Sequence, residues 1–332
     1  MAKGVARCSG HGSHWYAPVG GARFADGDAS RPDRTAVSIQ SEPRYLTRAH
    51  DVWLVCLVSC SRHDNGSLTS GVASELEQSS ILGVVATLPP LYAHRLGREP
   101  GPDSSRATLQ ATLAGPVDGL ETDACLTADG RLVLLHDPWL STATTLRGWA
   151  HQTAWSDLRH AHLRDRYAAP TNETPMLLDE LLDAAPRDLR VQVEVKAHDD
   201  PALARASAAA VCRLVGRRAD RDRVGVLSFH TAACEEAVRH GLPARLVTWA
   251  DYAPTALARW ATRTGVGGVC IEHFLLHPVL VERLRSHGLS VTTGTVNDAT
   301  LAARAAALDV DAITTDRPAA LHRELAAMSL AA

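Results

Sequence analysis

The sequence contains very little lysine. Of its 34 basic residues only Lys3 and Lys196 are lysines, and every other one is an arginine. A lysine ammonium is a compact point charge on a flexible stem, whereas an arginine guanidinium is a wide planar fork. We therefore infer that Lys196 occupies a position where arginine does not serve; the alternative is chance survival of one surface lysine.

Other scarce features count against whole classes of protein. The seven cysteines are scattered, odd in number and never in a CxxC pair, which argues against a disulfide framework or a thiolate zinc site. No apolar run reaches the roughly 18–20 residues of a membrane span, so we expect no transmembrane segment. The formal net charge of −3 gives no electrostatic reason to expect a nucleic acid partner.

Residues 1–80 read as an N-terminal extension of low order. Up to about residue 72 they are rich in Gly, Ser, Arg, His and Asp and lack sustained hydrophobic periodicity. The apolar patch 53–60 ends in the letters LVSC, which resemble a bacterial lipobox. A signal peptide needs an apolar core of about 7–15 residues close behind a basic N-terminus, whereas this patch is short and lies far from Met1. We therefore expect a cytoplasmic protein, with a secreted or lipid-anchored form left open.

Residues 81–328 show a different pattern, in which short apolar runs alternate with amphipathic, alanine-rich stretches. This alternation predicts an α/β fold with a parallel sheet. About eight units at this length suit a TIM-type (β/α)8 barrel, with one strand surplus to it. A doubly wound open sheet is the alternative, although no GxGxxG follows the first strand. The expected strands are 91–94, 119–123, 133–136, 191–194, 224–228, 245–248, 268–271, 290–293 and 312–315, and the expected helices are 105–114, 201–217, 231–239, 254–263, 278–287 and 298–307.

Polar side chains gather where the expected strands end. In a TIM barrel the carboxyl ends of the strands form one rim, where active sites are built. We therefore expect residues far apart in sequence to surround one pocket. They are His94, Arg95, Glu121, Asp123, His136, Asp137, Glu194, Lys196, Ser228, His230, Glu272, His273, Asn297 and Asp316.

Three carboxylates in this set suggest a metal site. Glu121 and Asp123 are two residues apart on one strand and so share a face, as do Glu194 and Lys196. Three converging carboxylates repel one another, and a hard cation such as Mg²⁺ or Ca²⁺, which prefers oxygen ligands, removes that repulsion. Any one of these acids alone could be a solvated strand end or a helix N-cap.

Four motifs share the order and spacing of a known family. They are Ala93-His94-Arg95, Asp118 to Asp123 (DGLETD), Leu126 to Gly130 (LTADG) and His136-Asp137-Pro138; later segments that match are Glu194-Val195-Lys196, Ser228-Phe229, Thr295-Val296-Asn297 and Asp311 to Pro318 (DAITTDRP). Together these motifs resemble the glycerophosphodiester phosphodiesterase family over about residues 88–325. The chain departs from the family pattern at three places. Leu96 replaces the glycine after HR, the segment 102–105 (PDSS) replaces PENT, and Gly294 replaces the tryptophan before TVN.

The resemblance implies a TIM barrel that hydrolyses a small-molecule glycerophosphodiester to glycerol 3-phosphate and an alcohol. It implies a divalent cation, Mg²⁺ or Ca²⁺, held by Glu121, Asp123 and Glu194. Arg95 and Lys196 would neutralise the phosphate oxygens. His94 and His136 suit general acid–base roles, because an imidazole with a pKa of about 6.5 exchanges protons near neutral pH. Which histidine is the acid stays open.

Two other functions fit the sequence. One is hydrolysis of lysophospholipids of the lysophospholipase D type, which would need an apolar slot for an acyl chain near Leu96 and Gly294. The other is a non-catalytic barrel that binds phosphodiesters, motivated by the changed PENT and tryptophan positions. Retention of both histidines and all three carboxylates argues against that second reading. The headgroup, the preferred metal and the oligomeric state are not specified by the sequence.

Overall fold

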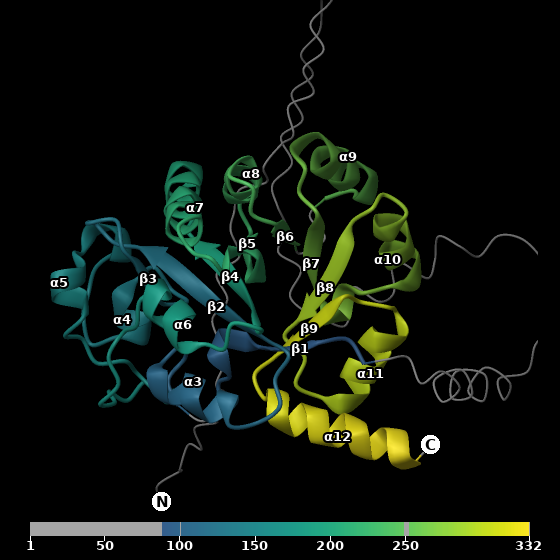
Figure 1. The fold of residues 1–332 in the computed structure, drawn as a ribbon, viewed down its shortest axis with the longest axis horizontal. Helices are drawn as coiled ribbons and strands as arrows, with labels where there is room; N and C mark the ends of the chain where they lie inside the picture. The colour runs from purple at the N-terminus through teal and green to yellow at the C-terminus, as the bar shows by residue number, and fades with distance from the viewer. Residues whose placement is uncertain (1–87, 100, 249–251, 332) are drawn as a thin grey trace, which may run out of the picture. The chain divides into compact units, whose positions relative to one another are not determined.

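The computed structural model describes residues 88–99, 101–248 and 252–331 (Figure 1). Eight parallel strands pair side by side, and β1 pairs with both β2 and β9, so the sheet closes on itself. The predicted TIM-type (β/α)8 barrel is confirmed. Its strands are β1 (Leu91–Ala93), β2 (Gly119–Leu126), β4 (Arg190–Lys196), β5 (Val224–Ser228), β6 (Ala244–Thr248), β7 (Gly268–Glu272), β8 (Ser290–Gly294) and β9 (Ala312–Thr315). The predicted extension 1–80 and the LVSC segment lie outside the described residues.

Helices follow most strands and cover the outside of the barrel, as Figure 1 shows for α7 to α10. They are α3 (Arg106–Leu113), α7 (Pro201–Val215), α8 (Thr231–Arg239), α9 (Pro254–Thr264), α10 (Pro278–Arg285), α11 (Ala299–Ala307) and α12 (Pro318–Ala331). Side-chain caps fix several starts. Ser105 accepts a hydrogen bond from the Thr108 amide, Asp200 from those of Ala202 and Leu203, and Asp298 from that of Leu301. Among the described residues, no helix is both long and apolar enough to span a bilayer.

One predicted strand does not belong to the barrel. Strand β3 (Leu132–Leu134) pairs antiparallel to the distal half of β2 and has no other strand partner in the sheet order. It is the surplus strand, because the pairing of β1 with β2 stops at Leu120 and β3 folds back along the edge of β2 beyond that point. The surplus strand that the sequence left unidentified is therefore the one expected at residues 133–136.

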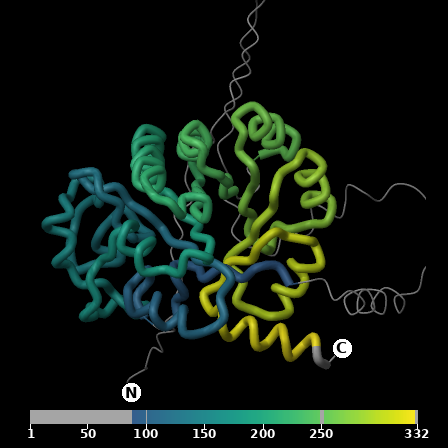
Figure 2. The backbone as a smooth tube through the Cα atoms, viewed as in Figure 1, coloured from purple at the N-terminus to yellow at the C-terminus, as the bar shows by residue number. Residues whose placement is uncertain are grey.

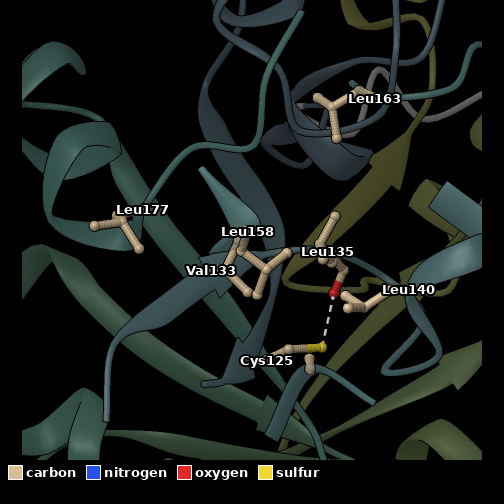
Figure 3. Close-up of a cluster of buried hydrophobic side chains, with 8 residues drawn as sticks. Cys125, Val133, Leu135, Leu140, Leu158, Leu163 and Leu177 are labelled. Carbon is tan, nitrogen blue, oxygen red and sulfur yellow. Dashed lines mark hydrogen bonds between the residues drawn. The ribbon is translucent and has the colours of Figure 1, made fainter. Parts of the chain in front are cut away.

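The segment between β3 and β4 forms a small subassembly beside the barrel. It contains α4 (Leu140–Ala143), a 3₁₀ turn η2 (Ala150–Gln152), α5 (Trp155–Leu158) and α6 (Leu178–Ala184), none of which the sequence patterns predicted. Leu140 of α4 and Leu158 of α5 belong to the same buried apolar cluster as Val133 of β3 (Figure 3). The Cys125 thiol of β2 donates to the Leu135 carbonyl at 3.2 Å inside this cluster. Apolar burial, rather than helix propensity, therefore organises these short elements.

Ring closure brings the two ends of the described chain together. Tyr92 of β1 stands opposite Gly119 of β2 on one side and Thr314 of β9 on the other. In Figure 2 the earliest and latest coloured segments accordingly meet at the centre of the view. The loops that follow β1, β8 and β9 are thus neighbours on one rim, although about 220 residues separate the first from the last.

Candidate active site

Strand register places the three predicted carboxylates together. Asp123 of β2 stands directly opposite Glu194 of β4, and Glu121 lies two residues earlier on the same face of β2. One carboxylate oxygen from each of the three residues lies within 4.8 Å of the other two. Glu121 and Asp123 are almost fully buried, with 3% and 1% of their surface exposed. The described residues thus contain a compact, buried group of three acids at the rim.

Two cations lie against this acidic group. The Lys196 ammonium is 3.0 Å from Asp123 Oδ1 and 2.6 Å from Glu194 Oε1. The Arg95 guanidinium approaches the other oxygen of Asp123, with Nε at 3.5 Å from Oδ2. Burial acts to raise the pKa of Asp123, but the charges of Lys196, His136 and Arg95 outweigh it and hold that pKa below its usual value. Asp123 is therefore ionised at neutral pH.

Glu121 behaves in the opposite way. Its burial, together with the charges of Asp123 and Glu194, raises its pKa well above the usual value. Its contact to Arg95 is a backbone one, in which the Arg95 amide donates to Glu121 Oε2 at 2.9 Å. The charge of the acidic group therefore exceeds what its neighbours neutralise, and a divalent cation would lower the pKa of Glu121 by supplying the missing charge.

The residues present fit a hard divalent cation. Asp123 Oδ2 is a buried oxygen that no donor among the described residues hydrogen-bonds, which is the kind of atom a bound cation would satisfy. All three donors are carboxylates, the ligand type that Mg²⁺ and Ca²⁺ prefer. Glu121, Asp123 and Glu194, the ligands that the sequence predicts, are the residues that would hold such an ion.

The loop after β1 turns sharply to present Arg95. Its backbone adopts left-handed φ values of 50° at Arg95, 66° at Leu96 and 93° at Gly97. The Arg95 guanidinium donates to Asp103 Oδ2 at 2.7 Å, and the carbonyl of Arg95 accepts from the Ser104 amide at 2.9 Å. Asp103 stands at the position of the glutamate in the PENT motif, and it holds Arg95 through Oδ2 and Arg98 through Oδ1, the latter at 2.8 Å.

His94 has a partner that the sequence did not reveal. Its Nδ1 lies 2.6 Å from Asp316 Oδ1, at the end of β9. Burial lowers the pKa of His94 and outweighs the hydrogen bond and charge of Asp316, which act to raise it. His94 is therefore neutral at neutral pH. Asp316 stands among the polar residues at the strand ends, but no sequence spacing connects it with His94.

His136 reaches the site by a route different from the predicted one. It follows antiparallel β3, whose backward course carries it toward the level of Asp123 on β2. Its charge contributes to the low pKa of Asp123, which places the two side chains near each other. The Asp137 carboxylate lies 3.3 Å from His136 Nδ1. The position of His136 at the site therefore does not follow from the rule that carboxyl ends of parallel strands form one rim. It follows from the antiparallel pairing of β3 with β2.

Several other predicted rim residues have structural or peripheral positions. The Ser228 hydroxyl donates to the Val195 carbonyl at 3.0 Å and so ties β5 to β4. His230 contacts the His198 carbonyl through its Nε2. Glu272 is half-buried at the end of β7, where burial and then the charge of Glu194 raise its pKa to about 7.

Comparison with known proteins agrees with this arrangement. The sequence pattern of the Glycerophosphoryl diester phosphodiesterase family matches residues 94–320. The chain is 29% identical over 216 residues to probable glycerophosphodiester phosphodiesterase 2 of Mycobacterium tuberculosis, covering 60% of this chain and 75% of that protein. It is 30% identical over 108 residues to the uncharacterized protein YqiK of Bacillus subtilis, and that match covers 32% of this chain and only 44% of YqiK.

Solved structures share the fold. A putative glycerophosphoryl diester phosphodiesterase from Silicibacter pomeroyi is 26% identical with a TM-score of 0.64, covering 76% of this chain and 97% of that one. An Oleispira antarctica phosphodiesterase in complex with the product sn-glycerol-3-phosphate is 21% identical with a TM-score of 0.63, and the match covers 74% of this chain and 98% of that one. At that identity the likeness concerns the fold alone. Because the family pattern spans more than half of the chain and includes both histidines, both cations and all three acids described above, the chain belongs to the glycerophosphoryl diester phosphodiesterase family of phosphoric diester hydrolases.

Proposed function

We propose that this protein hydrolyses glycerophosphodiesters to glycerol 3-phosphate and an alcohol, with a divalent cation held by Glu121, Asp123 and Glu194. The observation that carries the proposal is the buried group of three carboxylates within 4.8 Å of one another, flanked by two cations and two histidines. A phosphodiester is a monoanion whose negative charge grows on the non-bridging oxygens during attack. A site that combines a divalent cation with Lys196 and Arg95 would stabilise that growing negative charge.

The charged residues would divide the work of binding the phosphate. A divalent cation held by Glu121, Asp123 and Glu194 would supply Lewis-acid stabilisation of the phosphoryl oxygens. Arg95 offers N–H donors that suit two oxygens at once, and Asp103 holds it in position at 2.7 Å. Lys196 forms ion pairs with both Asp123 and Glu194, so its charge offsets the repulsion between the two carboxylates. It also adds a positive point charge to the pocket.

The two histidines would handle the protons. His94 is neutral at neutral pH because burial lowers its pKa, so it is able to accept a proton. His136 enters from β3 and is 22% exposed in its side chain, with Asp137 beside its Nδ1. One of the two takes a proton from the attacking hydroxyl or water, and the other gives a proton to the departing alcohol.

The first experiment measures release of glycerol 3-phosphate from glycerophosphocholine by the full chain. Reactions would contain Mg²⁺, Ca²⁺ or EDTA, and would compare the wild type with His94→Ala and with His160→Ala, an exposed histidine, as the matched control. We expect metal-dependent release that is lost in His94→Ala and kept in His160→Ala. Absence of release from folded protein with either ion would overturn the proposal.

A parallel reaction on lysophosphatidylcholine tests lysophospholipase D-type activity. Leu96 is completely buried and therefore adds no apolar wall to an acyl-chain slot. We accordingly expect glycerophosphocholine to be the better substrate. Faster headgroup release from the lysolipid would reverse that preference, and turnover of neither substrate would favour a binding barrel.

A further inference from the structure

The hydrogen bonds behind His94 form a connected network at the rim. Asp316 uses one carboxylate oxygen for His94, with Oδ1 at 2.6 Å from Nδ1, and the other for Asn297, whose Nδ2 donates to Oδ2 at 2.7 Å. The three residues come from the loops after β1, β9 and β8, which ring closure brings together. None of them belongs to the acidic group or pairs with Lys196.

Asn297 is itself held in one orientation. Its Oδ1 accepts from the Asp316 amide at 2.8 Å and from the Thr315 hydroxyl at 3.0 Å. An amide oxygen is the only side-chain atom of asparagine that accepts hydrogen bonds, so these two donors identify it and direct Nδ2 toward Asp316. Asn297 therefore fixes which way the Asp316 carboxylate faces.

The chemistry of the pair decides where the His94 proton lies. An ionised carboxylate only accepts hydrogen bonds, so the ring nitrogen that faces it must carry the proton. Burial acts to raise the pKa of Asp316, but the hydrogen bond and charge of His94, together with the hydrogen bond from Asn297, lower it and the net pKa lies below its usual value. A neutral His94 opposite an ionised Asp316 then has its proton on Nδ1 and its lone pair on Nε2.

We propose that Asp316 and Asn297 are positioning residues that hold the His94 ring in the Nδ1-protonated form, so that Nε2 is the nitrogen that exchanges a proton with the substrate. The kinetic part of this inference rests on the proposed function. Neither residue needs to touch the substrate. Asp316 orients the ring, and Asn297 orients Asp316.

Two variants separate positioning from simple packing. In Asp316→Asn the side chain keeps its shape but offers only one acceptor oxygen, and its amino group must face either the Asn297 amino group or His94 Nδ1. We expect kcat to fall by about 10²–10⁴-fold with little change in KM, because a misplaced proton disables acid–base chemistry without removing phosphate contacts.

The double variant N297D/D316N exchanges the carboxylate and the amide. The carboxylate now at position 297 accepts from the amino group of the side chain at position 316, whose carbonyl oxygen turns back toward His94 Nδ1. We expect the double variant to recover at least about tenfold of the kcat lost in D316N, which is coupling that independent sites do not show. Asp311→Asn is the matched control, since Asp311 caps the other end of β9 through the Val291 amide and should leave kcat unchanged.

A second measurement reads the proton directly. Nitrogen-15 NMR of histidine-labelled full chain distinguishes the two neutral ring forms, and the His94 resonances are assigned by their loss in His94→Gln. We expect protonated Nδ1 in the wild type, its loss in D316N and its return in the double variant. Protonated Nε2 in the wild type, or wild-type kcat in D316N, would overturn the inference. Because this signal does not require turnover, an inactive wild type with protonated Nδ1 would count against the proposed function and not against the positioning.

Discussion

Replacing Lys196 by methionine tests whether one ammonium compensates the buried acids. Methionine keeps an unbranched chain that is one atom shorter than that of lysine, and it removes the charge. The ammonium lies 3.0 Å from Asp123 and 2.6 Å from Glu194, and the side chains of Lys196 and Asp123 are only 13% and 1% exposed. Removing one partner of such a buried pair leaves an uncompensated charge and costs about 3–5 kcal/mol.

The assay is urea unfolding at pH 7 in EDTA, with the midpoint and the slope both recorded. Arg131→Met is the control, because Arg131 pairs with Asp179 at 3.1 Å while both side chains stay at least 40% exposed. An exposed pair of this kind contributes less than about 1 kcal/mol. Adding Mg²⁺ or Ca²⁺ should stabilise Lys196→Met more than the wild type, since the ion then meets acids that have lost one of their two internal cations. A loss below about 1 kcal/mol, or equal to that of Arg131→Met, would refute the compensating role of Lys196.

Three further predictions follow from the site. Replacing His136 by Asn should lower kcat about 10²–10⁴-fold while the urea midpoint stays within the range of surface variants, and a kcat near wild type would remove His136 from the proton-transfer role. Asp103→Ala should raise KM for glycerophosphocholine more than it lowers kcat, because Arg95 loses its 2.7 Å hydrogen bond to Asp103. Steady-state kinetics measure both constants, and an unchanged KM would contradict the prediction. The native state keeps a proton on Glu272 up to about pH 7, so the contribution of Glu272 to metal-free stability should fall as pH rises from 5 to 8, by about 1–2 kcal/mol after discounting for solvent screening. The stability difference between the wild type and Glu272→Gln measures that contribution, and a difference that does not change with pH would contradict it.

The parts of the fold that repeat along the sequence were predictable. Helix α8 spans Thr231–Arg239, as the pattern predicts, and α9 and α11 differ by one residue at one end. Pro254 opens α9, Asp298 caps α11, and the amphipathic spacing within all three helices acts locally, so no tertiary information is needed. The antiparallel course of β3 and the short helices α4 to α6 were not predictable, because elements of three to seven residues show too little periodicity and depend on packing against one another.

The same distinction applies to the site. Glu121 and Asp123 are two residues apart, so their shared face follows from strand geometry alone. The partner of His94 is 222 residues away, and only closure of the ring between β1 and β9 brings Asp316 beside it. The function of Asp103 was likewise hidden, since its bond to Arg95 depends on a left-handed turn that no sequence pattern announced.

The scarcity of lysine gives the barrel a built-in unfolding reporter. An endoproteinase specific for lysine can cut this chain only after Lys3 and after Lys196. The second bond joins Lys196 to Ala197, which is 2% exposed, so cleavage there requires β4 to leave the sheet. A cut after Lys196 separates residues 1–196, with the three acids and both catalytic-site histidines, from residues 197–332, with Asp316 and Asn297. Proteolysis at a single bond would therefore report opening of the barrel, and neither product would keep a complete site.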